Sequence, residues 1–410
     1  MTAKPKPPRV EVHKWDFKAR FRRNAFGWKS QPAVTRVKEA VAEIKAVAKV
    51  DPVLAAEGAV VFLERVSPAI EHVDGSSGSM SAAVNKAIRD LWPLIANAPV
   101  DTEKREAWLE RLFAAHEADE MPYIEELTDH WGALCGSKEV ASKWAEKLLG
   151  LTRLALGPDT STRHYFHGSS ACLAALYHAE RYEEIIELLT VRTIWSFQQW
   201  AVRAMAASGD ADRALDCAES CRGLDADDWE VDIACEEILL AAGRHHEAYA
   251  RYGVGANQTG TCLATFRTVK KKYPHVAPAE VLADLVRSTP GDEGQWFSAA
   301  KDAGLYADAI ALVSQSPCDP KTLTRAARDY IQKQPAFAVE AGLLAVYWMV
   351  RNAGYSISSA DVWEAYRSTL AAAEQLGDAV EVKDRVRAVV AAEGPGDDFV
   401  TRMIGRELGL

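Results

Sequence analysis

A pattern of three residues recurs in this chain at an interval of 34. The first copy is Trp195, Gly209 and Ala214, and the second is Trp229, Gly243 and Ala248. This period is typical of helix-turn-helix arrays, in which each hairpin buries its apolar face only by packing on its neighbours. The glycine suits a turn between two helices, and the alanine suits a close contact between them. The pattern therefore predicts stacked helical hairpins.

The recurrence is irregular along the chain. Gly304 and Ala309 have the same spacing, whereas residues 180–185 match the turn pattern in shape only. Successive copies are separated by 29, 34 and 61 residues, so only one step equals the repeat length. We therefore expect tetratricopeptide-like hairpins only in the middle of the chain.

Apolar side chains elsewhere recur with a helical period of about 3.6 residues, and no segment alternates convincingly as a strand would. The sequence therefore predicts an all-α chain, an α-solenoid of stacked antiparallel helical hairpins. Its predicted parts are an N-terminal arm or cap (1–30), a helical array (31–157), tetratricopeptide-like repeats (158–316), and C-terminal repeats with a cap (317–410). Predicted breaks lie at 157–159 and 394–396, and residues 1–13 are predicted to be a disordered or extended arm.

Charge is distributed unevenly. Residues 1–30 have a net charge of +7, whereas the whole chain has a net charge of −10, so the remaining residues sum to −17. Basic and aromatic side chains alternate between Trp15 and Trp28. Candidate contacts to an anionic ligand are Lys18, Arg20, Arg22, Arg23, Trp28 and Lys29.

Two interpretations of this basic segment remain open. Lys and Arg can neutralise phosphates while aromatic rings stack on bases, so nucleic-acid binding through residues 14–29 is one of them. The other is an amphipathic cap, in which Phe17, Phe21 and Trp28 close the end of the array.

Four stretches resemble a family of uncharacterised bacterial helical-repeat proteins, tetratricopeptide-like in kind. They are FKARFRRNAFGWKS (17–30), HVDGSSGSMSAAVNKAI (72–88), WFSAAKDAGLYADAIAL (296–312) and SPCDPKTLTRAARDY (316–330). The similarity covers almost the whole chain. It implies one architectural unit of bacterial origin, and it implies no activity, cofactor or catalytic residue.

Motifs that carry chemistry are missing from the sequence. The glycines form neither a phosphate-binding loop nor a dinucleotide fingerprint, and no nucleophile elbow is present. The acidic stretch 116–130 lacks the Glu-x-x-His spacing of di-metal bundles, so we expect a solvated acidic face there. We expect no catalytic residue, no metal and no cofactor. Seven cysteines, an odd number without zinc-ligand spacing, favour free thiols and a cytoplasmic location.

The tetratricopeptide register also predicts a partner-binding groove. Its candidate residues are His167, His178, Gln199, Trp200, Arg203, Glu230 and Glu237. An aromatic anchor with mixed charges suits a peptide or helix. The alternative for Trp200 is simple packing between hairpins.

These observations favour a non-enzymatic scaffold or adaptor that binds a protein or peptide in the concave groove of a helical solenoid. One alternative is a nucleic-acid-associated protein that uses the basic N-terminal arm. A second alternative is a helical-repeat enzyme with an unrecognised site. We expect no membrane association, because the longest apolar run near the C-terminus (341–350) is too short to span a bilayer.

Overall fold

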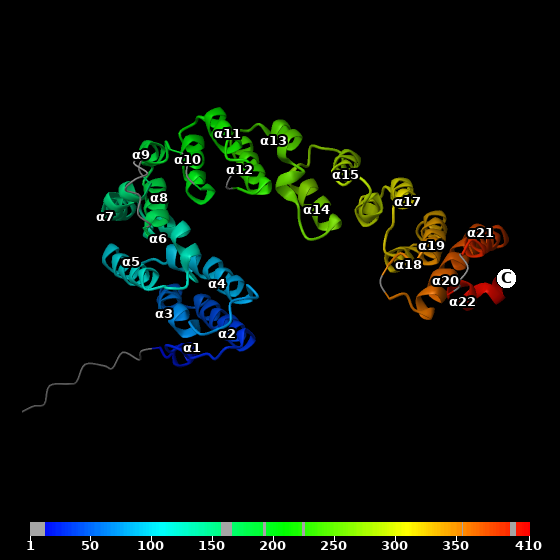
Figure 1. Ribbon diagram of the computed structural model, residues 1–410, viewed down its shortest axis with the longest axis horizontal. Coiled ribbons are helices and arrows are strands. Elements are labelled where there is room, and N and C mark those ends of the chain that lie inside the picture. The colour runs from blue at the N-terminus through cyan, green and yellow to red at the C-terminus, as the bar shows by residue number, and fades with distance from the viewer. Residues whose placement is uncertain (1–12, 157–165, 192–193, 224–225, 355, 394–398) are drawn as a thin grey trace, which may run out of the picture. The chain divides into compact units, whose positions relative to one another are not determined.

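A computed structural model describes residues 13–156, 166–191, 194–223, 226–354, 356–393 and 399–410. The fold is all-α: 74% of it is helical, and the described residues form 22 α-helices and no strand (Figure 1). The chain divides into two compact units, Met1–Asp227 and Asp228–Leu410. The predicted breaks at 157–159 and 394–396, and nearly all of the predicted disordered or extended arm, lie outside the described residues.

The helices of unit 1 (Met1–Asp227) range from five residues in α1 to nineteen in α2, α3 and α7. The helices are α1 (Asp16–Arg20), α2 (Ser30–Ala48), α3 (Pro52–Ile70), α4 (Ser79–Ala96), α5 (Thr102–Glu117), η1 (Glu125–His130), α6 (Trp131–Cys135), α7 (Lys138–Leu156), α8 (Ser169–His178), α9 (Tyr182–Leu188), α10 (Trp195–Ala207) and α11 (Ala211–Glu219). The main packing contacts join each helix to those that follow it by one or two positions, such as α2 to α3 and α4.

Unit 2 (Asp228–Leu410) follows the same rule of contact between near neighbours. Its helices are α12 (Asp228–Ala241), α13 (His245–Tyr252), η2 (Gly255–Asn257), α14 (Cys262–Lys272), α15 (Pro278–Arg287), η3 (Glu293–Trp296), α16 (Phe297–Asp302), α17 (Tyr306–Gln315), α18 (Pro320–Asp329), α19 (Pro335–Val350), α20 (Ser359–Leu376), α21 (Ala379–Ala391) and α22 (Phe399–Leu408). The boundary between the units lies inside the predicted 158–316 segment, and the four-part organisation stays a prediction.

The three repeat glycines lie in turns, as predicted. Gly209, Gly243 and Gly304 have φ angles of 91°, 72° and 76°, which side chains with a Cβ rarely adopt. In each turn the next residue donates its N–H to a carbonyl five positions back, at 2.8 to 3.1 Å, which closes the first helix. The turn between α8 and α9 has the same bond (Arg181 to Leu176, 2.9 Å), although Glu180 takes the left-handed position with φ 59°.

The repeat alanines are buried, also as predicted. Ala214, Ala248 and Ala309 have no exposed surface, and each lies on the second helix of a hairpin whose two helices pack together. The tryptophans of the pattern differ from each other, because Trp195 is buried whereas 54% of Trp229 is exposed. The interval of 34 residues therefore preserves the turn and the alanine contact but not the environment of the tryptophan.

A buried arginine joins three helices of unit 1. Arg105 on α5 donates hydrogen bonds to carbonyls at the end of α4, including Ala98 at 2.8 Å, and to Leu134 on α6 at 3.4 Å. Burial lowers the pKa of this guanidinium. A cation at the end of a helix satisfies carbonyls that have no partner within the helix and is favoured by the helix dipole.

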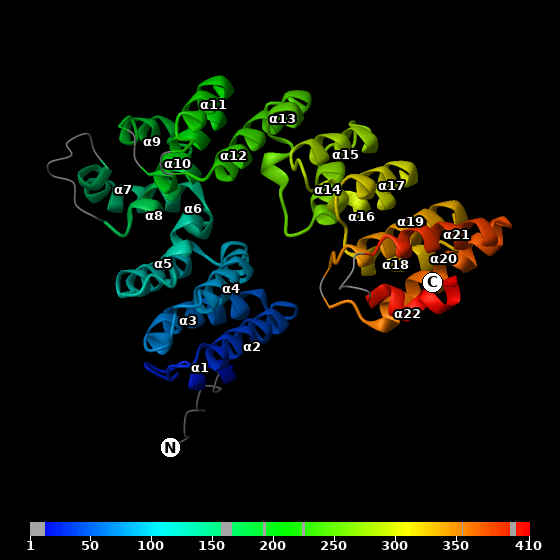
Figure 2. The ribbon, with the colours of Figure 1, turned by 45° about the vertical axis from the view of Figure 1, so that its right-hand side comes forward.

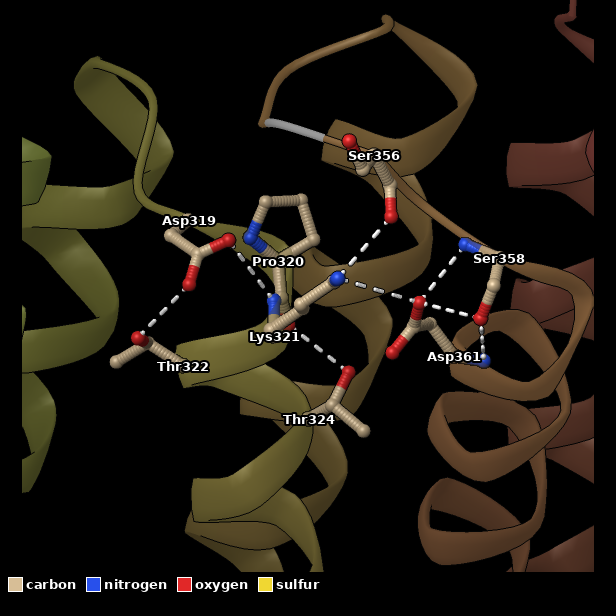
Figure 3. Close-up of polar contacts among 8 residues, drawn as sticks. All are labelled: Asp319, Pro320, Lys321, Thr322, Thr324, Ser356, Ser358 and Asp361. Carbon is tan, nitrogen blue, oxygen red and sulfur yellow. Dashed lines mark hydrogen bonds and ion pairs between the residues drawn. The ribbon is translucent and has the colours of Figure 1, made fainter.

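Side chains cap two helix starts of unit 2, and a lysine links these two starts. Figure 3 shows the start of α18, where Asp319 accepts from the backbone of Lys321, beside the start of α20, where Ser358 and Asp361 form a capping box. The Lys321 ammonium donates to the Ser356 carbonyl (3.0 Å) and lies 3.5 Å from the Asp361 carboxylate, so it links the two helix starts. The segment 316–330, one of those that carry the family resemblance, thus contributes to the packing of helices.

All seven cysteines are free, and four of them are buried. Among the described residues, no helix has both the length and the apolar character that crossing a membrane requires.

We predict opposite effects for two glycine-to-alanine changes in unit 1. A Cβ would meet no atom within 4 Å at Gly209 or at Gly150, so packing does not distinguish the two sites. Gly209→Ala should lower the free energy of unfolding by about 1–2 kcal/mol, because it forces a side chain into the left-handed region. Gly150→Ala, at an exposed position inside α7, should raise it by about 0.5–1 kcal/mol through helix propensity. Urea unfolding of both variants measures the difference, and equal effects would contradict the proposed role of the turn.

Candidate functional site

A hollow on unit 2 lies between two consecutive hairpins. It has a volume of about 710 Å³ and is open to solvent. Its walls come from α13, the loop after α14, and α15, which Figure 2 shows near the start of unit 2. The lining residues are His246, Tyr249, Ala250, Val254, His275, Val276, Glu280, Asp284, Arg287 and Ser288. This volume lies within the range of ligand-binding pockets, and we call the hollow the α13–α15 pocket.

Two exposed imidazoles line this pocket, and a third lies beside them. His245 and His246 begin α13, and His275 lies in the loop between α14 and α15. The ring of His275 is 4.7 Å from that of His246 and 6.4 Å from that of His245, measured between centroids. Pro274, two residues after the last residue of α14, contributes to this arrangement because a proline cannot continue the helix.

One side of the pocket is held by a phenol, a carboxylate and a guanidinium. The Tyr249 hydroxyl donates to Asp284 at 2.6 Å, and Arg287 pairs with the same carboxylate at 2.7 Å. Burial and the bond to Asp284 raise the pKa of Tyr249 far above its usual range, so the phenol stays protonated. Glu280, one turn before Asp284, is exposed, and its carboxylate has no hydrogen bond or ion pair among the described residues.

A buried polar cluster supports the pocket from behind. The Glu236 carboxylate on α12 is buried and accepts from Asn257 (2.5 Å), from Lys272 (2.7 Å) and from the Tyr273 hydroxyl. Burial, together with Glu236, raises the pKa of Tyr273. The Tyr273 ring contacts those of Tyr249 (5.2 Å between centroids) and His275 (5.9 Å). Because a buried carboxylate needs all of its donors, this cluster fixes the ring positions at the base of the pocket.

The side chains of the α13–α15 pocket can form hydrogen bonds, an ion pair and aromatic contacts. Its imidazoles and Ser288 can donate or accept hydrogen bonds, its tyrosine presents an aromatic surface, and Glu280 offers a negative charge. In the part of the chain that the structure describes, no three or more His, Cys, Asp or Glu side chains are arranged to hold a metal. The sequence argument missed this pocket. The signal that was available is the pair His245-His246 followed 29 residues later by His275.

The predicted groove residues of unit 1 have different exposures. Trp200 is buried, with the Arg203 guanidinium 5.1 Å from its ring and the Tyr177 ring 5.8 Å away. This environment favours the alternative in which Trp200 packs between helices. Arg203 is exposed, and Gln199 is partly exposed. His178 is partly exposed, whereas His167 is exposed and its carbonyl bonds the His116 ring at 3.0 Å.

The other two groove candidates lie in unit 2. Glu230 and Glu237 are both on α12, where Glu230 is partly exposed and Glu237 is exposed. The predicted groove thus draws on both units, and a shared binding surface stays a prediction.

Sequence reasoning also missed two residues beside Arg203. The His130 ring stacks on Trp92 at 4.7 Å, and burial and the charges of Arg203 and Arg89 lower its pKa. Asp129 is exposed at the surface, yet the protein atoms around its carboxylate reduce its hydration and raise its pKa to about 6, although Arg203 acts against this shift. Both residues are in the short η1–α6 segment, which packs against α8, and this packing brings them to Arg203 on α10.

The sequence predicted a solvated acidic face at residues 116–130. This prediction is wrong for two of these residues. His116 and Asp119 are almost completely buried. Asp119 accepts from the Ser67 hydroxyl and from the Ile124 backbone at 2.8 Å, and burial raises its pKa. This carboxylate closes the turn after α5 against α3, which explains its burial.

Aromatic residues dock the N-terminal segment on unit 1. Trp15, Phe17 and Phe21 are buried, and the last two contact the Phe62 ring on α3 at 5.9 and 5.2 Å. Gly58 on α3 is required here, because a Cβ would lie only 2.3 Å from the Trp15 ring. The segment therefore covers the α3 surface, as the cap interpretation predicts. Trp28 departs from that interpretation, because 72% of it is exposed.

The cations of the segment remain on the surface. Arg20 pairs with Glu39 at 2.9 Å, and Arg23 lies 3.9 Å from Glu71. The remaining candidates, Lys18, Arg22 and Lys29, are exposed. Capping by aromatics and an exposed cationic surface therefore coexist in this segment.

The chain matches no protein-family model, no curated protein and no solved structure. The resemblance to bacterial helical-repeat proteins thus stays a prediction.

Asp129 provides a test of the electrostatics beside Arg203. The folded state raises the pKa of this carboxyl to about 6, so the charged form is disfavoured and stability falls as the pH rises through that range. We expect Asp129→Asn to increase the melting temperature at pH 7–8 and to leave it nearly unchanged at pH 4. Carbon-13 NMR of the carboxyl groups should show a resonance that titrates near pH 6 and disappears in this variant. A melting-temperature difference that does not vary from pH 4 to pH 8 would contradict the desolvation.

Proposed function

We propose that this chain is a non-enzymatic scaffold or adaptor, built as an α-solenoid with tetratricopeptide-like hairpins, that binds a protein or peptide partner. The observation that carries this proposal is the α13–α15 pocket, an open hollow between consecutive hairpins lined by exposed imidazoles, a phenol and a free carboxylate. Repeat proteins generally bind partners on surfaces that successive repeats build together. The four similar turns and the three buried alanines support the repeat architecture.

The pocket composition supports recognition over catalysis. Tyr249 is held protonated by Asp284, so it is a poor nucleophile, and the three histidines are exposed to solvent instead of being oriented by buried carboxylates. Aromatic rings with a few polar groups are the composition of side-chain-binding pockets in protein interfaces. A bacterial, cytoplasmic adaptor is consistent with the family resemblance and with seven free thiols.

The adaptor proposal predicts that the pocket histidines contribute to partner binding. Partners captured by the tagged full-length chain would be purified and titrated calorimetrically against it. The double variant His246→Ala/His275→Ala should weaken binding at least tenfold, which corresponds to about 1.4 kcal/mol. His72→Ala, a change of an exposed histidine on unit 1, is the control and should bind like the parent chain. If both variants bound the partner with equal affinity, the proposal that the partner binds at the pocket would be contradicted.

A second candidate function rests on the N-terminal segment. The buried aromatics fix this segment on α3, while Lys18, Arg22 and Lys29 and the ring of Trp28 stay exposed. Fixed cations with an exposed ring suit single-stranded nucleic acid, whose phosphates they neutralise and whose bases stack.

Salt dependence tests this second function. For a fluorescent single-stranded 20-mer, replacing Lys18, Arg22 and Lys29 by Ala should reduce the slope of log affinity against log salt by up to about two. The matched control replaces the exposed Lys271, Lys333 and Lys383 of unit 2 by Ala and should leave the slope unchanged. Binding that is absent, or equally lowered in both triple variants, would exclude a specific role of the segment.

A further inference from the structure

The α13–α15 pocket contains one charge that its own residues do not balance. It has two carboxylates, Glu280 and Asp284, which are four positions apart on α15 and so occupy the same helical face. Asp284 is satisfied by the Tyr249 hydroxyl and by Arg287. Glu280 is exposed, and its carboxylate binds no described residue.

The groups around Glu280 suit a positive charge with an apolar stem. Ala250, Val254 and Val276 give apolar wall, and the Tyr249, His246 and His275 rings give aromatic surface. Aromatic faces attract guanidinium and ammonium groups, and the methylene stems of Arg and Lys pack on apolar surface. An anion would meet Glu280 as a like charge, and the pocket guanidinium of Arg287 is already paired with Asp284.

From this charge balance we infer that the α13–α15 pocket binds a basic side chain, arginine or lysine, of a protein partner. The cation pairs with Glu280, and the stem lies along the Tyr249 ring and the small apolar residues. His246 and His275 border the site and fix its width, because their rings already contact each other. This inference rests on the proposed adaptor function and adds the chemistry of the group that the partner inserts.

The positions of Tyr249 and His275 explain how an open surface pocket can be selective. Both rings pack on Tyr273, whose hydroxyl is bound to buried Glu236. Side chains that are held by a buried cluster lose little conformational entropy when a ligand arrives. The pocket is therefore preorganised even though it faces solvent.

Small charged fragments test the charge selectivity directly in the full-length chain. n-Butylguanidinium imitates an arginine side chain, and butyrate is its anionic counterpart. Imidazole resonances of His246 and His275, assigned with His→Gln variants, report on binding by NMR. We expect butylguanidinium to produce saturable shifts in the millimolar range and butyrate to produce none. Saturation by butyrate alone, or by neither fragment, would overturn the inference.

Variants of Glu280 test the pairing. Glu280→Gln should weaken butylguanidinium binding at least fivefold, and Glu280→Lys should abolish it. Glu374→Gln, a change of an exposed glutamate on α20, is the matched control and should bind within twofold of the parent chain. Melting curves establish that each variant is folded. Unchanged binding in Glu280→Gln would show that another group receives the cation.

A peptide ligand distinguishes a site for a protein side chain from a site for a free small amine. The blocked heptapeptide Gly-Ser-Gly-Arg-Gly-Ser-Gly should bind at least as tightly as butylguanidinium, because the open pocket leaves room for the flanking backbone. A peptide that binds more weakly would indicate a site for small amines and would overturn the assignment to a protein side chain. If the fragments fail while a captured partner still depends on His246 and His275, the inference falls and the adaptor function stands.

Discussion

The hairpin turn is the local structure on which the rest of the chain depends. A helix of about ten residues cannot bury its apolar face alone, so it must be reversed onto a second helix within a few residues. One residue in the left-handed conformation does this, and the hydrogen bond to the carbonyl five positions back terminates the first helix at a fixed place. In the three hairpins with a turn glycine, the alanine five positions after that glycine is then buried, because a methyl group allows the second helix to approach the first closely.

Buried polar groups hold neighbouring helices together in each unit. Arg105 satisfies carbonyls at the end of α4 and on α6, and Glu236 holds together side chains from α12, η2 and α14. Such groups are costly to bury unless every hydrogen bond is made. Around Glu236 these hydrogen bonds form a rigid cluster. The Tyr249 and His275 rings pack on this cluster at the surface. The base of the proposed recognition pocket therefore depends on a cluster of buried polar groups.

The N-terminal segment combines two properties that the sequence presented as alternatives. Trp15, Phe17 and Phe21 pack on the chain and the basic residues face solvent, since a short amphipathic segment can bury one side and expose the other. Anchoring by Trp15, Phe17 and Phe21 holds the cations in place instead of leaving them on a free tail. Docking on the chain and contact with a polyanion are thus compatible.

The sequence by itself determined the all-α class, the turns at Gly209, Gly243 and Gly304, and the burial of the matching alanines. These features are local, because they depend on periodicity and on backbone conformations that only certain residues adopt easily. It did not determine which tryptophans are buried. Trp195 and Trp229 occupy the same position in the pattern, yet only Trp195 is buried, and Trp200 lies inside unit 1 although the register placed it in a groove. The α13–α15 pocket and the Asp129–Arg203 neighbourhood were decided by the tertiary structure alone. Each joins residues from separate helices, and their proximity depends on how those helices pack, which no spacing along the chain records.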